Sequence, residues 1–324
     1  MNSQLQALSQ WAQLQLNDPG ITLQSLYGDA SHRRYYRIQK SSNSLIIVDA
    51  SAELAEIPVF IGVAKILQQK GLSVPHIYAM DIERGFLLLS DFGDQTLLQQ
   101  LTGQNVDYYY QQAFDHLLCM QKHDNIEYAN LADYDEVLIV REWETFTDWF
   151  LQAYKNVDLN AHRAVLTHTL QLLLTIMQTQ PQIFIHRDYH SRNLMILPDK
   201  QLGILDFQGA RRGPITYDLV SVLKDCYIDW PQQRVKHWAL SMQTRIWRQA
   251  NLSSIDTAQF LRYFDLTGLQ RHLKVLGQFA RKAIAEQDDS YLVDMPRVKK
   301  YVLDVCQTYD ELYAFKQFLL EIKF

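Results

Sequence analysis

The sequence is poor in glycine and proline, with 12 Gly and 8 Pro among 324 residues. Soluble proteins average roughly 7% Gly and 5% Pro. The chain therefore has little room for flexible linkers and none for collagen-like repeats. The same shortage means that a phosphate-binding loop here cannot be recognised from a run of three glycines.

Cysteine is also scarce, and its three positions lie far apart, at Cys119, Cys226 and Cys306. An odd number of cysteines without metal-like spacing argues against both a disulfide framework and a zinc site. The first 16 residues are rich in glutamine and lack the charged start and apolar centre of a leader peptide. We therefore expect a protein of the reducing cytoplasm.

The sequence has neither a long apolar run nor a basic excess. No apolar segment approaches the roughly 20 residues that cross a bilayer. The 31 Lys and Arg against 36 Asp and Glu leave a net charge of −5. We expect no membrane partner and no nucleic-acid partner. A composition that is 48% hydrophobic predicts instead a folded chain with a sizeable core, and about 150 residues per domain favours about two domains.

The hydrophobic pattern changes near residue 92. The first part holds short apolar runs typical of strands, and the later part is mainly helical. One helical face in the later part comprises Leu166, Leu170, Leu173, Leu174 and Met177. We predict an α+β protein with a small β-rich N-terminal lobe, residues 1–92, and a larger, mainly helical C-terminal lobe, residues 93–324.

One stretch of the helical half is rich in side chains that perform chemistry. Residues 185–193 read Ile-His-Arg-Asp-Tyr-His-Ser-Arg-Asn, and short apolar runs follow at 194–197 and 201–205. A Pro-Asp-Lys turn separates the two runs, which predicts an antiparallel hairpin. Asn193 and Asp206 flank this hairpin at the same end, and we expect to find them directly opposite each other.

Three oxygen-bearing side chains would meet at this end of the hairpin, because Asp188 lies on the loop before it. Amide and carboxylate oxygens are ligands that Mg²⁺ prefers. One carboxylate can orient an attacking hydroxyl while the other two groups hold metal on nucleotide phosphates, which is typical of phosphoryl transfer. A single Asp or Asn beside a turn is more often a turn former, so the prediction depends on the combination.

The same residues resemble a known catalytic loop. His186, Asp188 and Asn193 match the H-R-D-x-x-x-x-N loop of protein kinases. With His190 they also match the H-x-D-x-H-x-x-N loop of aminoglycoside-phosphotransferase-like small-molecule kinases. Asp206 begins an Asp-Phe-Gln triplet that stands where kinases have D-F-G.

Other segments extend the resemblance over most of the chain. Residues 213–219 resemble the segment that follows the metal-binding Asp in the small-molecule kinases. Residues 225–231, Asp-Cys-Tyr-Ile-Asp-Trp-Pro, resemble the bacterial anomeric N-acetylmuramate/N-acetylglucosamine kinases of cell-wall recycling. The resemblance implies a protein-kinase-like two-lobed fold that uses ATP and Mg²⁺.

The resemblance also implies residue roles. Asp188 would be the catalytic base, Asn193 and Asp206 the Mg²⁺ ligands, and Asp218 a structural brace for the catalytic loop. A loop over the phosphates and a hinge at residues 88–92 against adenine would bind the nucleotide. The nucleotide-binding residues would be Gly28, Ser31, Arg33, Ser90 and Phe92.

Two features depart from the kinase pattern. The strand at residues 44–50 lacks the lysine that clamps the α- and β-phosphates in protein kinases, and Asp49 stands near that position. Either another cation replaces the lysine, with Arg33 and Arg34 as the candidates, or the affinity for the nucleotide is weak. Residues 91–93 spell Asp-Phe-Gly, but they precede the catalytic loop and follow an apolar strand, so we interpret them as part of the hinge.

Three further residues are candidates for the acceptor side. Glu142 shares an apolar helical face, so it needs either a ligand such as a sugar hydroxyl or a salt bridge to an arginine. Arg211 could bind transferred phosphate or a lactyl carboxylate, or form a solvent-facing pair with Arg212. For His190 the resemblance favours a positioning role in the loop.

The sequence therefore predicts a kinase that transfers the γ-phosphate of ATP to a sugar hydroxyl. The preferred acceptor is the anomeric hydroxyl of N-acetylmuramate or N-acetylglucosamine. Two alternatives stay open, namely another small acceptor such as an aminoglycoside, choline or homoserine, and a nucleotide-binding pseudokinase. A protein kinase is less favoured because no A-P-E motif or long activation segment follows Asp206.

Overall fold

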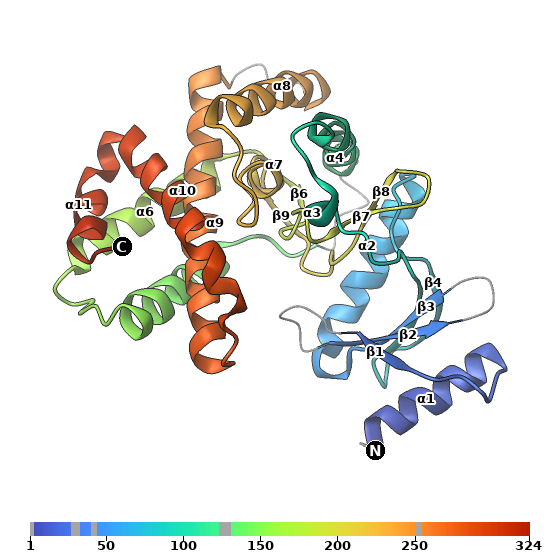
Figure 1. Cartoon of the computed structure of the whole chain (residues 1–324). Helices are drawn as coiled ribbons and strands as arrows, with labels where there is room; N and C mark the ends of the chain where they lie inside the picture. Colours follow the sequence, from blue (N-terminus) through green and yellow to red (C-terminus); the bar gives the residue numbers. More distant parts are fainter. Residues whose placement is uncertain (1–2, 27–32, 40–43, 123–130, 251–254) are drawn as a thin grey trace. The chain divides into compact units, whose positions relative to one another are not determined.

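The chain divides into two compact units, and each is described by itself. The first contains residues Met1–Ala113 and Arg192–Ala210, and the second contains Phe114–Ser191 and Arg211–Phe324. The computed structural model (Figure 1) describes residues 3–26, 33–39, 44–122, 131–250 and 255–324. The lobe boundary that the sequence suggests, after residue 92, stays a prediction.

The first unit is built on a five-stranded antiparallel sheet in the order β1-β2-β3-β5-β4. Its strands are β1 (Gln24–Leu26), β2 (Arg34–Gln39), β3 (Ser44–Asp49), β4 (Ile77–Asp81) and β5 (Phe86–Ser90). Its helical segments are α1 (Ser3–Leu16), the 3₁₀ helix η1 (Ser51–Glu56), α2 (Ile57–Gln69) and α3 (Leu97–Gln100), while α4 (Val106–Gln121) continues into the second unit. Helix α1 packs its Leu8 and Trp11 against Ile38, Ile47 and Phe86 of the sheet, which forms an apolar core.

The predicted hairpin is present in the first unit as β7 (Leu194–Ile196) and β8 (Leu202–Ile204). The register pairs Leu194 with Ile204, and the Leu205 N–H donates to the Asn193 carbonyl at 2.9 Å. The expectation that Asn193 lies directly opposite Asp206 is therefore wrong by one residue. Asp206 leaves the strand with φ +64°, a left-handed conformation that ends the regular pairing.

The second unit is mainly helical. Its helices are α5 (Glu136–Glu144), the π-helix η2 (Thr145–Tyr154), α6 (Arg163–Thr179), α7 (Tyr217–Leu223), α8 (Gln232–Ala250), α9 (Thr257–Ala285), the 3₁₀ helix η3 (Asp289–Asp294), α10 (Met295–Thr308), the 3₁₀ helix η4 (Asp310–Leu312) and α11 (Tyr313–Glu321). Strands β6 (Gln182–Ile185) and β9 (Arg211–Pro214) form a two-stranded ladder. The leucine face predicted around residues 166–177 is confirmed as part of α6, which ends two residues before Pro181.

Helix α9 runs through the apolar core of the second unit. Its buried side chains include Leu266, Leu273 and Leu276, which share one cluster with Phe146 of η2 and Val302 of α10. The long orange-to-red helix in Figure 1 is α9, with α10 running beside it. The Asp256 carboxylate caps α9 by accepting the Gln259 N–H at 2.8 Å.

The close approach of α9 to η2 depends on Gly277. A Cβ added to Gly277 would lie 2.2 Å from the Thr145 carbonyl oxygen and 2.7 Å from the Phe146 nitrogen, both of them backbone atoms. We expect Gly277→Ala to lower the free energy of unfolding by about 3 kcal/mol, because the overpacking penalty exceeds the roughly 1 kcal/mol that Ala gains in helix propensity. Urea unfolding monitored by circular dichroism measures the change.

Gly268 on the same helix is the matched control. A Cβ there would meet the Val220 Cγ1 atom at 3.4 Å, an ordinary contact. We expect Gly268→Ala to leave the free energy of unfolding unchanged or to raise it by up to about 1 kcal/mol. Equal effects of the two substitutions would show that close packing of α9 against η2 is not what Gly277 provides.

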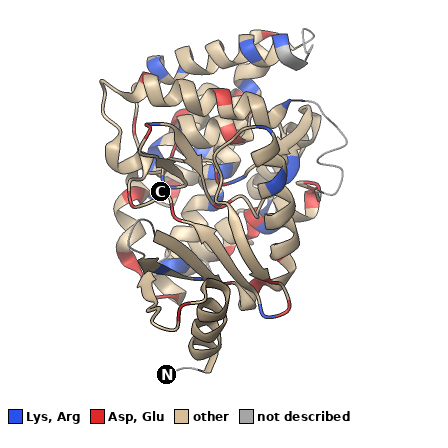
Figure 2. Ribbon diagram, turned by 90° about the vertical axis from the view of Figure 1, so that its right-hand side faces the viewer, with Lys and Arg blue, Asp and Glu red and all other residues tan. Residues whose placement is uncertain are grey.

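Acidic and basic residues are mixed along the elements. Figure 2 shows Lys and Arg in blue interspersed with Asp and Glu in red along the helices and loops. Within the part of the chain that the structure describes, no helix has both the length and the apolar character needed to cross a membrane.

Candidate active site

The catalytic-loop motif follows strand β6 in the second unit, and Asp218 of α7 holds its start. The buried Asp218 carboxylate accepts the His186 N–H at 2.6 Å and the Arg187 N–H at 3.0 Å. Burial raises the pKa of Asp218 to about 7, against the opposing effect of these two N–H donors. The structure therefore shows Asp218 bracing the loop backbone, as the resemblance implies.

Arg187 is a strained residue at the centre of the loop. Its φ of +75° lies in the left-handed region, which is costly for a residue with a long side chain. The Arg187 guanidinium donates to Glu142 at 2.6 Å, and the Arg187 carbonyl accepts from Arg271 Nη1 of α9 at 2.8 Å. Together with the contact from Asp218, these hydrogen bonds hold the strained backbone of Arg187 from three helices, α5, α7 and α9.

Asp188 follows directly and is partly buried. Burial opposes its charge, but Lys274 and Arg187 outweigh burial and lower the pKa of the Asp188 carboxyl below its usual range. His190 and Arg271 act in the same direction. The Asp188 side chain is therefore ionised at neutral pH and is able to accept a proton from a hydroxyl group that is being deprotonated.

Glu142 of α5 lies beneath this loop on the apolar face that the sequence indicates. Its carboxylate accepts hydrogen bonds from Tyr134 and, at 2.9 Å, from Gln270, and it forms ion pairs with Arg187 at 2.6 Å and Lys274 at 3.0 Å. The salt bridge to an arginine, which the sequence leaves as the alternative to a sugar contact, is present. Burial is unfavourable for this charge, but Lys274 and Arg187 lower the pKa of Glu142 to about 2.

This pKa predicts how stability depends on pH. The pKa of Glu142 in the folded protein, about 2, lies below its ordinary value of 4.5. Its stabilisation is therefore present above pH 4.5 and is lost as the pH falls toward 2. We expect the difference in free energy of unfolding between the wild type and Glu142→Gln to narrow by about 2 kcal/mol from pH 6 to pH 3. Urea unfolding at both pH values measures it, and a difference independent of pH would contradict the assignment.

The end of the loop contacts the segment after α7. The Ser191 N–H and hydroxyl donate to the Asp225 carboxylate at 2.8 and 2.6 Å. The His190 ring lies edge-on to Tyr227 with 5.7 Å between ring centroids, and the His190 Nδ1 atom has no hydrogen-bond partner among the described residues. Residues 225–231, which carry part of the resemblance, therefore contact the end of the catalytic loop through Asp225 and Tyr227.

The two neighbouring arginines of β9 have different environments. Strand pairing places the half-buried Arg211 opposite Ile185, directly before the catalytic loop. Arg212 is exposed and forms an ion pair with the exposed Asp133 at 2.6 Å. Of the two arginines that the sequence could have placed together in solvent, only Arg212 is exposed. Arg211 lies beside the catalytic loop.

The residues with metal-ligand chemistry lie in the first unit, at the end of the hairpin. Asn193 Nδ2 donates to Asp206 Oδ2 at 3.3 Å, and Gln208 Nε2 donates to Asp206 Oδ1 at 2.6 Å. The Phe207 ring between them is buried and stacks on Phe60 of α2 at 4.8 Å between centroids. Asn193 and Asp206 therefore lie within hydrogen-bonding distance of each other, despite the one-residue difference in register.

The pair of Asn193 and Asp206 suits a Mg²⁺ ion that is shared with phosphate and water, and does not suit a metal ion bound by protein ligands alone. Across the described ranges of the chain, no group of three His, Cys, Asp or Glu side chains could hold a metal ion. A carboxylate from Asp206 and an amide oxygen from Asn193 are hard ligands, and Mg²⁺ commonly takes one or two such groups and completes its coordination with phosphate oxygens and water. The residues fit the metal that the resemblance implies.

The expected nucleotide residues are distributed along the first unit. Arg33 is buried and forms ion pairs with Glu53 at 2.8 Å and Glu56 at 3.0 Å. Ser90, at the end of β5, exchanges hydrogen bonds with the backbone of His76. The Phe92 ring packs against Gly203 of β8, where an added Cβ would approach it to 2.6 Å. Gly28 and Ser31 lie outside the described residues.

The Asp-Phe-Gly triplet at residues 91–93 has a structural explanation. The Asp91 carboxylate accepts hydrogen bonds from Arg37 at 2.6 Å, from the Ser44 hydroxyl at 2.6 Å and from the Gly93 N–H at 2.8 Å. A carboxylate with these donors anchors the end of β5 to β2 and β3. Asp49, in place of the kinase lysine, accepts the Ser51 N–H at 3.1 Å.

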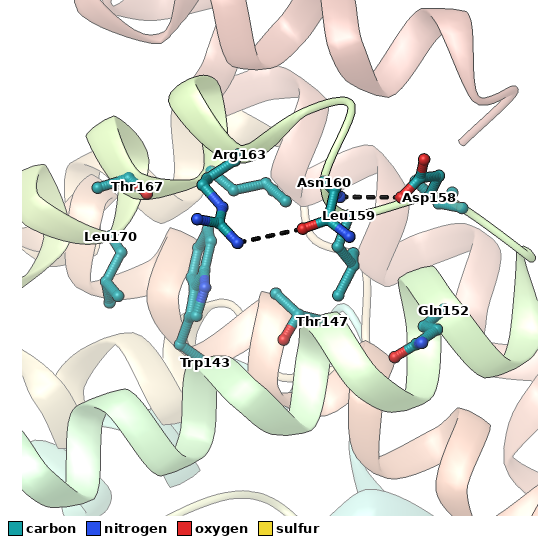
Figure 3. Close-up of a pocket in the computed structure, with 11 residues that line it drawn as sticks. Trp143, Thr147, Gln152, Asp158, Leu159, Asn160, Arg163, Thr167 and Leu170 are labelled. Carbon is teal, nitrogen blue, oxygen red and sulfur yellow. Dashed lines mark hydrogen bonds between the residues drawn. The ribbon is translucent and has the colours of Figure 1, made fainter.

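A separate cavity of about 400 Å³ lies in the second unit between η2 and α6 (Figure 3). Its lining includes Trp143, Thr147, Asp158, Asn160 and Arg163. Arg163 donates to Asn160 at 3.1 Å, and the Asn160 N–H donates to Asp158 at 3.0 Å. The site residues expected from the sequence are not among those that line this cavity.

Sequence reasoning missed three polar residues of α9, namely Arg271, which donates to the loop, and Gln270 and Lys274, which contact Glu142. They occupy neighbouring positions on one side of a helix whose other residues in this stretch are largely apolar and buried. A cation in such a stretch requires a buried counter-charge. Two cations at these positions of an apolar helix could therefore have indicated a buried carboxylate partner. Nothing in the sequence alone identified Glu142 as the partner.

Solved structures share the fold of this chain. An aminoglycoside phosphotransferase, APH(2'')-Ib in its ADP-bound form, superposes with a TM-score of 0.61 over 91% of this chain and 96% of its own, at 10% identity. The choline kinase LicA from Streptococcus pneumoniae superposes with a TM-score of 0.61 over 94% and 100%, at 11% identity. The predicted α+β, protein-kinase-like two-lobed fold is thereby confirmed.

The family assignment is specific. The model of the phosphotransferase enzyme family matches residues 22–250, and the chain belongs to this family. A protein of Pseudomonas aeruginosa named N-acetylmuramate/N-acetylglucosamine kinase is 42% identical over 279 residues, covering 85% of this chain and 80% of the relative. A protein of the same name from Pseudomonas putida is 36% identical, covering 98% and 96%. The protein is a phosphotransferase and a small-molecule kinase.

Proposed function

We propose that the protein transfers the γ-phosphate of ATP, with Mg²⁺, to the anomeric hydroxyl of N-acetylmuramate or N-acetylglucosamine. The observation that carries the proposal is the ionised Asp188 within the loop that runs from His186 to Asn193. The names of relatives that cover most of this chain support the choice of acceptor. The product would be the sugar 1-phosphate.

Asp188 would orient the sugar hydroxyl and take its proton as the oxygen attacks the γ-phosphorus. Asn193, five positions further along the chain, and Asp206 would hold Mg²⁺. When bound, the metal neutralises charge on the β- and γ-phosphates. The Gln208 amide, which donates to Asp206, would keep that carboxylate oriented.

Arg33 is our candidate for the cation that replaces the missing strand lysine. Its guanidinium carbon lies 6.0 Å from the centre of the Phe60 ring, and Phe60 stacks on Phe207, the residue after Asp206. Burial raises the pKa of the Tyr35 hydroxyl to about 12, and the charges of Asp206 and Arg33 both act on it. Arg33 is thus linked through Phe60 to the residue that follows Asp206, and a guanidinium is a suitable group for a phosphate contact.

The acceptor would be bound by residues next to the catalytic loop. Arg211 suits the lactyl carboxylate of N-acetylmuramate, because a guanidinium binds a carboxylate with two parallel hydrogen bonds. His190 has a ring nitrogen without a partner among the described residues and suits a sugar hydroxyl. Ser90 and Phe92, with Gly28 and Ser31, remain our proposed nucleotide contacts.

Coupled ADP release with a panel of acceptors tests the function. The panel contains N-acetylmuramate, N-acetylglucosamine, the methyl glycoside of N-acetylglucosamine, an aminoglycoside, choline and homoserine. We expect Mg²⁺-dependent turnover of the two amino sugars and none of the methyl glycoside, whose anomeric oxygen is blocked. Turnover of the methyl glycoside would exclude anomeric transfer.

The remaining outcomes separate the alternatives. Inert amino sugars with turnover of choline, homoserine or the aminoglycoside would overturn the acceptor and leave the kinase assignment standing. Mg²⁺-dependent ATP binding without ADP release on any acceptor would favour a nucleotide-binding scaffold.

A further inference from the structure

Three polar side chains of helix α9 lie at the start of the catalytic loop: Arg271 donates to the loop itself, while Gln270 and Lys274 contact Glu142. We propose that Glu142, Arg271 and Lys274 are positioning residues that hold Asp188 in place through Arg187. This proposal rests on the proposed function, because it assigns the geometry of that same catalytic loop.

Arg187 is held at three points. Asp218 accepts its N–H at 3.0 Å, Arg271 donates to its carbonyl at 2.8 Å, and Glu142 accepts from its guanidinium at 2.6 Å. These contacts fix the peptide units on either side of Arg187 in a left-handed conformation that the residue would otherwise avoid. The peptide unit after Arg187 leads directly into Asp188, so its orientation sets the direction of the catalytic carboxylate.

Arg271 connects the loop to helix α7. Its Nη1 contacts the loop while its Nη2 donates to the Ser221 hydroxyl of α7 at 2.6 Å, and its guanidinium carbon lies 4.6 Å from the centre of the Tyr217 ring. One planar guanidinium therefore connects α9, α7 and the loop. A lysine has a single charged nitrogen and no planar fork, so it cannot make both hydrogen bonds in this geometry.

Glu142 and Lys274 form a buried ion pair. Glu142 is 5% exposed and Lys274 is 8% exposed, and their charged groups lie 3.0 Å apart. Without Lys274, the Arg187 guanidinium would be the remaining cation paired with Glu142 among the described ion pairs. The loss of one partner from a buried ion pair leaves an uncompensated charge, and the remaining groups rearrange. Arg187 is the remaining ion-pair partner of Glu142, so we expect its side chain to shift and to pull on the backbone that leads into Asp188.

A well-packed apolar replacement for buried ion pairs is often as stable as the pairs. Stability alone therefore does not explain why Arg187 and Lys274 both pair with the buried Glu142 at this loop. Fixed geometry at Asp188 does give a reason, because a small misplacement of a catalytic group costs about 10²-fold in rate.

Steady-state kinetics of four variants tests the proposal, with wild-type turnover of the amino sugar as the baseline. We expect Lys274→Met and Arg271→Lys to lower kcat by about 30-fold, with the KM for ATP within twofold of wild type. We expect Lys274→Arg to retain kcat within about threefold, because it keeps the charge opposite Glu142. Lys282→Met is the matched control, since Lys282 is a buried lysine of α9 whose partner Glu286 is remote from the loop, and we expect its kcat to be unchanged.

The double variant Glu142→Gln/Lys274→Met removes both charges together and keeps the test informative if Lys274→Met does not fold. We expect its kcat loss to be smaller than the product of the two single losses, as for a directly coupled pair. Wild-type kcat in folded Lys274→Met, or equal losses in Lys274→Met and Lys282→Met, would overturn the proposal. A parallel fall of kcat, affinity for ATP and melting temperature would also overturn it, because that is a purely structural effect. An inactive wild type would instead contradict the proposed function.

Discussion

Asp188→Asn is expected to reduce turnover of N-acetylmuramate by about 10³-fold or more. Asn is nearly isosteric with Asp but cannot accept the proton of the attacking hydroxyl. The wild-type carboxylate is kept ionised against the effect of burial by Lys274 and Arg187, so the substitution removes a base that is fully available at neutral pH. Coupled ADP release at saturating ATP and acceptor measures the loss.

The control for this variant is its folding and nucleotide binding. The Asp188 backbone carbonyl accepts the His190 N–H at 3.1 Å, and this contact does not depend on the side chain. We expect the melting temperature and the affinity for ATP with Mg²⁺ to stay close to wild type. Turnover at more than about a tenth of the wild-type rate in a pure, folded preparation would rule out Asp188 as the base.

Asp206→Asn is expected to reduce kcat/KM by about 10³-fold at physiological Mg²⁺. The substitution removes the one negatively charged ligand we assign to the metal and leaves the neutral amide of Asn193. A weaker metal site should also require a higher Mg²⁺ concentration for half-maximal rate. A Mg²⁺ titration of ADP release, followed for the wild type and the variant, measures both effects.

Asp199→Asn is the matched control for Asp206→Asn. Asp199 is an exposed carboxylate in the turn of the same hairpin, where it accepts the Gln201 N–H at 3.0 Å. We expect its Mg²⁺ dependence to equal that of the wild type. Asp206→Asn and Asp199→Asn with the same Mg²⁺ dependence would mean that the metal is held elsewhere.

Much of the first unit was predictable because its signals are local. The hairpin after Asn193 follows from two apolar runs separated by a turn, and the structure confirms it. The one-residue error in the Asn193–Asp206 pairing has a physical cause. Register depends on how the turn closes and where the last residue leaves the strand, and the positive φ of Asp206 is set by its surroundings.

The contacts of the catalytic loop could be predicted only in part, because many of them come from residues far apart in the chain. The brace by Asp218 was expected from the resemblance and is seen as two short hydrogen bonds. The role of Glu142 was left open, because an apolar helical face reveals that a buried carboxylate needs a partner but not which one. The partners come from the segment before α5, from the loop after β6 and from α9, and Lys274 is 132 positions away in the chain.

The sequence by itself determined the class of protein and predicted the chemistry of its loop. Motif spacing, the hairpin pattern and the resemblance depend on residues close together in the chain, and such patterns are readable without a fold. Tertiary structure decided the rest, namely which cations surround Asp188, which partner satisfies Glu142 and how Arg187 is held. These depend on contacts between distant segments, because buried charges are stable only where folding brings their counter-charges within a few ångströms.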